Sequence, residues 1–214
     1  MKLFMKLNFR KIIASGLIFV LVLPFYLLVE PAYAVTDDIL VTLTVTSGIS
    51  ITSPADCALA PAITISNNKA ICGSTWNVKT NSTTGYSLSV KAQASPALVS
   101  GANSFADYTP AVADTPELWT VASSAKEFGY SAYGTDTPTG TWGTSTAACG
   151  TAGAPDVTLK YQNTKTTDRL VSTRATTTPV AGIDTTFCGA VEQNGVYAAS
   201  GSYQATITAT AITI

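Results

Sequence analysis

The sequence contains no histidine, and this absence excludes several kinds of active site. Without histidine, neither a Ser-His-Asp nor a Cys-His nucleophile system can form, and the commonest metal ligand is missing. Phosphate-binding loops of the G-x-x-x-x-G-K-[ST] and G-x-G-x-x-G types are absent as well. We therefore predict that the protein is not an enzyme and uses no cofactor.

Charged residues are also scarce, at 12% of the chain. After residue 34 there are 8 basic and 12 acidic side chains, a net charge of −4. Such a chain cannot neutralise a run of phosphates, so nucleic acid is not an expected partner. Thr, Ser, Ala and Gly are abundant instead, which is typical of an extracellular β-protein. An apolar content of 46% argues against disorder.

Residues 1–34 have the three parts of a secretory signal peptide. Basic residues lie within 2–11, an apolar run covers 12–29, and Ala32 and Ala34 form the A-x-A pattern that signal peptidase reads. We expect cleavage after Ala34, export by the general secretory route, and a mature chain that is secreted or at the cell surface. The alternative is an uncleaved anchor, because roughly 18 apolar residues nearly span a bilayer. Only then would the protein contact a membrane.

Cys57, Cys72, Cys149 and Cys188 all follow the predicted cleavage site. An even number of cysteines in an exported chain indicates disulfides, and four cysteines allow three pairings. We favour Cys57–Cys72 and Cys149–Cys188, because each pair lies within one half of the chain. A zinc site is the alternative, but the sequence has no C-x-x-C pair, so we predict no metal site.

Short alternating segments separated by turn residues predict the fold. The stretch "DILVTLTVTSGISIT" places Ile39, Val41, Leu43 and Val45 on one face, which is the period of a half-buried strand. The chain ends on a similar stretch, "GSYQATITATAITI", and no helical period follows residue 34. We predict that residues 35–214 form one all-β domain, an antiparallel β-sandwich (Ig-like or jelly-roll-like) of about nine strands. A closed barrel is the alternative.

The stretch "TWNVKTNSTTGYSLSVKA" reads as two strands joined by a polar loop. Trp76 shares a face with Val78, and Tyr86 shares a face with Leu88. Both aromatic rings are therefore predicted to point into the core rather than to form a binding platform.

This stretch, together with "PALVSGANSFADY" and the final "GSYQATITATA", resembles secreted bacterial proteins of unknown function. The layout is also similar to WxL-type cell-surface domains and to the spore-coat-U group of pilin-like subunits. The resemblance implies a β-sandwich at the cell surface that takes part in attachment or in an outer layer. The W-x-L tripeptides themselves are absent, and no catalytic residue carries over from these families.

Two aromatic residues are candidates for ligand binding. Trp142 lies between Gly140 and Gly143 in "PTGTWGTST", where no alternation buries it, so it could stack on a sugar ring. The structural alternative is that this loop folds back and Trp142 caps one end of the sandwich. Tyr133 is a further candidate, because it points away from the face of Phe128 and Tyr130.

Carboxylate side chains are the remaining groups that could catalyse a reaction or bind a metal ion. Their spacing, however, indicates neither a catalytic pair nor a calcium-binding loop. We expect most of them to be solvated surface groups. The candidates for a carboxylate pair are Asp107, Asp114, Glu117, Glu127 and Asp136, and those for calcium are Asp37, Asp38 and Asp136.

These observations predict an exported structural or adhesion protein of the cell surface without catalytic activity. One alternative is a carbohydrate-binding module. The other is a pilin-like subunit in which the two alternating chain ends exchange strands between copies. The expected partners are accordingly a cell-envelope component, a glycan, or other protein subunits.

Overall fold

We analysed a computed structural model, which describes residues 39–145 and 148–214. The chain divides into two compact units, Met1–Thr44 and Val45–Ile214. The predicted signal peptide, residues 1–34, and the calcium candidates Asp37 and Asp38 lie outside the described residues. No helix in the described ranges has the length and apolar character needed to cross a bilayer.

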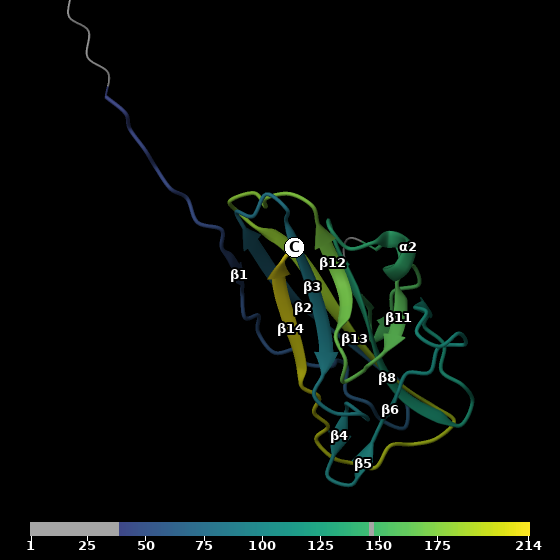
Figure 1. The fold of residues 1–214 in the computed structure, drawn as a ribbon. Helices are drawn as coiled ribbons and strands as arrows, with labels where there is room; N and C mark the ends of the chain where they lie inside the picture. Colours follow the sequence, from purple (N-terminus) through teal and green to yellow (C-terminus); the bar gives the residue numbers. More distant parts are fainter. Residues whose placement is uncertain (1–38, 146–147) are drawn as a thin grey trace, which may run out of the picture. The chain divides into compact units, whose positions relative to one another are not determined.

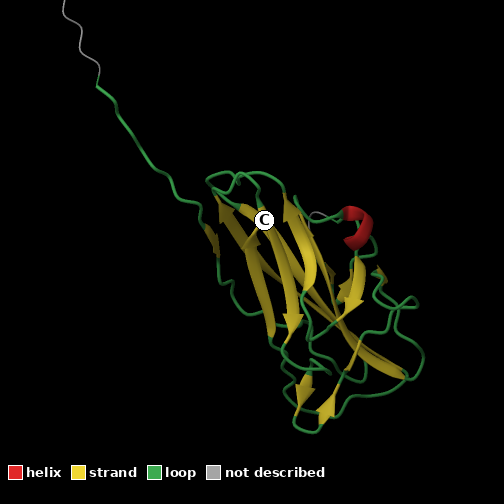
Figure 2. Cartoon of the chain, in the orientation of Figure 1, coloured by secondary structure: helices red, strands yellow, loops and turns green. Residues whose placement is uncertain are grey.

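Strands and one helical turn make up the regular structure of the residues described in the second unit (Figure 2). The helix is α2 (Thr139–Trp142). The strands are β1 (Ile49–Ile51), β2 (Lys69–Thr80), β3 (Tyr86–Ala92), β4 (Val99–Ser100), β5 (Asn103–Ser104), β6 (Ala106–Asp107), β7 (Glu117–Leu118), β8 (Ala125–Gly134), β9 (Gly150–Thr151), β10 (Ala154–Pro155), β11 (Lys160–Asn163), β12 (Arg169–Arg174), β13 (Ile183–Asn194) and β14 (Ile207–Thr213).

Two sheets carry the fold (Figure 1). The larger has seven strands in the order β1-β2-β13-β8-β11-β7, with β6 parallel to β8; the smaller has three, in the order β12-β3-β14. Two-stranded ribbons, β4-β5 and β9-β10, complete the strand pairs. The chain is therefore all-β and sandwich-like, as predicted, and its main sheet pairs are antiparallel.

The inner faces of the two sheets share one core. Trp76 and Phe187 come from the larger sheet, and Tyr86 and Leu88 from the smaller one. Trp76 and Tyr86 are 8% and 0% exposed, so the prediction that both rings point inward is confirmed. The reason is strand parity: β3 alternates buried and half-buried residues along its whole length, with Tyr86 on the buried side.

Both predicted disulfides are present, Cys57–Cys72 and Cys149–Cys188, with sequence separations of 15 and 39. In the chain-entropy model, closing loops of these lengths stabilises the fold by about 3 and about 4 kcal/mol. Two structural disulfides indicate an oxidising, extracytoplasmic environment.

The first alternating segment departs from the prediction. Only Ile49–Ile51 forms a strand, β1, which pairs with the end of β2. Residues 39–45, called the N-terminal segment below, contain no strand. Their alternation makes them able to form a strand, but pairing needs a neighbouring strand edge, and the local pattern cannot supply one.

The stretch 93–116 is rich in turn residues, a composition that favours a surface loop, yet the structure shows strands and buried side chains here. It contains β4, β5 and β6, and it buries Leu98, Phe105 and Tyr108. Turn residues set the local backbone of such a stretch, whereas its large apolar side chains still pack onto the sheets.

Candidate functional site

Of the two interpretations of this loop, a Trp142 exposed to a ligand and a Trp142 folded back onto the sandwich, the structure shows the second. The side chain is 1% exposed and lies against Tyr130, with ring centroids 5.4 Å apart. The backbone N–H of Trp142 donates to the carbonyl of Pro138 at 2.9 Å, which curls α2 over the sandwich. The structural alternative for this loop is therefore the observed one, and Trp142 offers no free face to a ligand.

Gly143 makes this arrangement possible. Its φ is 94°, and a Cβ atom on it would lie 2.0 Å from the carbonyl oxygen of Thr158. Only glycine tolerates both conditions, so the loop can close onto Leu159, directly before β11, with which Gly143 forms a β-bridge. The glycines around Trp142, which suggested an open loop, instead permit close packing.

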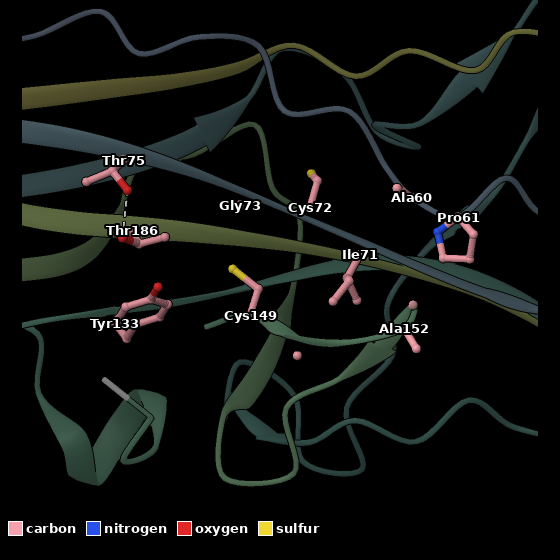
Figure 3. Close-up of a pocket in the computed structure, with 12 residues that line it drawn as sticks. Ala60, Pro61, Ile71, Cys72, Gly73, Thr75, Tyr133, Cys149, Ala152 and Thr186 are labelled. Atoms are coloured by element: carbon pink, nitrogen blue, oxygen red, sulfur yellow. Dashed lines mark hydrogen bonds between the residues drawn. The ribbon is translucent and has the colours of Figure 1, made fainter. Parts of the chain in front are cut away.

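Tyr133 lines a shallow pocket of about 530 Å³ on the outer side of the larger sheet (Figure 3). Thr75 and Thr186 line it too, and their hydroxyl groups are hydrogen-bonded at 2.8 Å. Figure 3 shows Tyr133 and this pair at one end of the pocket and Pro61 at the other. The lining contains no charged side chain, so the pocket suits a neutral ligand that an aromatic edge and hydroxyl groups can contact.

Three of the five carboxylate candidates are tied to basic or backbone groups. Asp114 pairs with Lys165 and with Arg169, and the hydrogen bond from Lys165 is the main cause that lowers the pKa of Asp114. Asp136 pairs with Arg174 at 3.1 Å. Asp107 accepts a hydrogen bond from the backbone N–H of Ala97 at 3.0 Å. Each of these contacts gives the carboxylate a partner from another part of the chain and so ties two elements together.

Asp136 also stabilises the smaller sheet. The hydroxyl of Tyr86 donates to Asp136 at 3.0 Å and lies 3.3 Å from the hydroxyl of Ser172. Burial is the main cause that raises the pKa of Tyr86 to about 12. This phenol therefore stays protonated at neutral pH and remains a hydrogen-bond donor.

Glu117 lies in β7 and Glu127 near the start of β8, where the structure adds a carboxylate, Glu192, that the sequence did not select. Glu127 is directly opposite Glu192 in the β8–β13 register. Glu192 accepts a hydrogen bond from Trp119 Nε1 at 2.7 Å and pairs with Lys69 at 3.2 Å. The two residues are 7% and 6% exposed. The sequence alone does not indicate the Glu127–Glu192 pair, because the two residues meet only when β8 and β13 lie side by side.

Burial raises the pKa of Glu127, and the charge of Glu192 raises it further. Glu117 accepts hydrogen bonds from the hydroxyl of Tyr108 and from the backbone N–H of Ala111. Neither Glu127 nor Glu192 lines the Tyr133 pocket. Across residues 39–145 and 148–214, no group of three or more Asp, Glu or Cys side chains is placed to hold a metal ion.

A groove of about 890 Å³ runs along one edge of the sandwich. One wall is the run of residues 203–209, which leads into β14, and the other wall is 51–59. Its floor contains the buried side chains of Trp76, Phe128 and Phe187. Asp56 is the one charged residue in the lining. The groove thus combines an apolar floor with walls of small and hydroxyl-bearing side chains.

The N-terminal segment has the opposite property, because it exposes apolar side chains. Ile39, Val41 and Leu43 are 85–87% exposed, and Val45 is 72% exposed. Covering a side chain of this kind stabilises a protein by about 1.5–3 kcal/mol. Four such residues on one face of a seven-residue segment indicate a strand that lacks its partner.

No family model matches the chain, and no curated protein and no solved structure is similar to it. The resemblance to WxL-type and spore-coat-U-like proteins therefore stays a prediction. The groove, the Tyr133 pocket and the N-terminal segment are the features of the molecule that bear on function.

Proposed function

We propose that the protein is an exported, non-catalytic structural subunit of the cell surface, which associates with copies of itself through the N-terminal segment. The observation that carries this proposal is the exposed apolar face of Ile39, Val41 and Leu43. An exposed segment with the alternation of a strand is a ready partner for strand addition, and soluble proteins normally protect such segments. The two disulfides support a place outside the cytoplasm, and the signal-peptide pattern supports the general secretory route.

A structural role also fits the carboxylates. Asp107, Asp114 and Asp136 bind neighbouring groups. In the Glu127–Glu192 pair, Glu192 accepts a hydrogen bond from Trp119 and forms an ion pair with Lys69. These contacts hold elements together, so none of them requires a substrate.

The test is the assembly state of the exported chain, measured by sedimentation and negative-stain microscopy. We expect the wild type to form oligomers or filaments. Leu43→Asp places a charge on the apolar face and should leave the protein monomeric, whereas Thr42→Asp, on the opposite face, should still assemble. A wild type that stays monomeric at all concentrations would refute the proposal.

Carbohydrate binding is the second candidate function, and the Tyr133 pocket is the observation that favours it. An aromatic ring beside the Thr75–Thr186 hydroxyl pair can stack on a sugar and bind its hydroxyl groups. On a glycan array, Tyr133→Ala should abolish any signal of the wild type, and Trp142→Phe should keep it because Trp142 is buried. No signal from the wild type would remove this candidate.

A further inference from the structure

We propose that the groove beside β14 is the acceptor for the N-terminal segment of a second copy of this chain. The inference rests on the proposed function, and it names the site at which one copy binds the next. A strand taken up here would lie between the walls 203–209 and 51–59, with its apolar face on the floor of the groove.

The free strand edge is the first argument. Among the described strands, β14 pairs with β3 alone. The backbone N–H of Gln93 donates to the carbonyl of Thr206, so Thr206, Thr208 and the alternate residues that follow direct their backbone groups toward β3. The backbone N–H and C=O groups of Ile207 and Ala209 consequently point to the open side. An added strand can bond to this row.

The match of length and side-chain period is the second argument. The wall 203–209 and the N-terminal segment both contain seven residues, which as a strand extend over about 23 Å. The wall turns Ala205, Ile207 and Ala209 toward the core. Small residues beside the open edge leave room for the Ile, Val and Leu side chains of an incoming strand.

The chemistry of the two surfaces is the third argument. The N-terminal segment carries no charge, and the groove lining has Asp56 as its one charged residue. Trp76 and Phe187, which meet edge to face with centroids 5.9 Å apart, provide an aromatic floor. Burial of aliphatic side chains on such a floor is the main driving force for association.

The start of β1 argues for a second copy rather than for the same chain. Asn81 accepts a hydrogen bond from the N–H of Gly48 at 2.6 Å and donates one to the carbonyl of Thr46 at 2.8 Å. These bonds hold 46–48 at the end of β2, and the chain enters β1 directly, which lies against β14. Directly before this anchored point, the apolar side chains of Ile39, Val41 and Leu43 are 85–87% exposed. They are therefore available to bind a second copy.

The experiment uses complementary single variants of the exported chain. Leu43→Asp spoils the segment but keeps the groove, and it should weaken association by about 100-fold or more. Ala209→Pro keeps the segment but removes an N–H that points to the open edge, and it should weaken association by about 10-fold. Thr208→Ala, whose side chain lies on the outer face, is the matched control and should assemble like the wild type.

The decisive measurement is a mixture of Leu43→Asp and Ala209→Pro. The only productive contact left joins a segment of the second variant to a groove of the first, so we expect heterodimers that do not grow further. Assembly that is lost in Leu43→Asp but unchanged in Ala209→Pro would overturn the groove as acceptor and leave the proposed function standing. A different outcome is a monomeric wild type whose melting temperature is lowered by Leu43→Asp. It would mean that the segment fills its own groove, and it would overturn both the acceptor site and the proposed function.

Amide hydrogen exchange provides a second measurement if Ala209→Pro fails to fold. In the wild-type assembly the amides of Ala205, Ile207 and Ala209 should be protected, and in the Leu43→Asp monomer they should exchange at least about 10-fold faster. Equal exchange in the two samples would overturn the proposed acceptor site.

Discussion

The two alternating ends of this chain have the same pattern and different environments. In β14, Ile207, Ala209 and Ala211 pack against the core, and β3 pairs with the whole length of β14 along one edge. In the N-terminal segment the equivalent apolar residues are exposed. A period of two therefore makes a segment able to form a strand, whereas the available edge decides where it pairs.

The largest expected effect concerns the floor beneath β14. Trp76→Ala should lower the free energy of unfolding by about 3–5 kcal/mol, because it removes a buried ring that contacts Phe187. Tyr197→Ala, at an exposed site, should change it by less than about 0.5 kcal/mol. Urea unfolding measures both values. An unchanged unfolding curve for Trp76→Ala would show that this face of β2 does not form the core.

The next effect concerns the wall opposite β14. Replacing Cys57 and Cys72 with Ser should lower the free energy of unfolding by about 3 kcal/mol and should also weaken association, because the Cys57–Cys72 bond fastens the wall 51–59 to β2. Replacing Cys149 and Cys188 should lower it by about 4 kcal/mol but leave association unchanged in the fraction that stays folded. Thermal unfolding and sedimentation separate the two effects. Equal loss of association in both pairs would contradict a specific role of the wall.

The smallest effect compares the two ends directly. Ile207→Ala should cost about 1–2 kcal/mol of unfolding free energy, since this side chain is half-buried. Val41→Ala should cost less than about 0.5 kcal/mol when it is measured on the dilute monomer. If Val41→Ala is as costly as Ile207→Ala under these conditions, the N-terminal segment is buried within its own chain.

Several features of the fold could be predicted because they depend on local order. Strand parity placed Trp76 and Tyr86 in the core, and the even cysteine count with short separations indicated both disulfides. The outward direction of Tyr133 also follows from parity, because it alternates with the buried Tyr130 and Ala132. These predictions needed only two facts: side chains alternate with a period of two along a strand, and cysteines of exported proteins usually form disulfides.

The candidate sites were harder to predict, because they depend on contacts between distant residues. Trp142 is buried because Gly143 lets its loop approach Thr158, and the glycines alone could equally indicate an open loop. Glu192 joins Glu127 only through the β8–β13 register. The groove beside β14 is lined by residues 51–59 and 203–209, which lie at opposite ends of the domain sequence.

Local pattern and composition were enough to predict the all-β class, the inward faces of the main strands and the presence of disulfides. The pairing of the four cysteines was one of three possibilities, and the structure shows which one forms. Only the tertiary structure decided which of two equally patterned ends joins a sheet and which side of the sandwich stays open. Hydrogen-bonding edges and apolar floors are properties of the assembled sheets, so no stretch of sequence carries them alone.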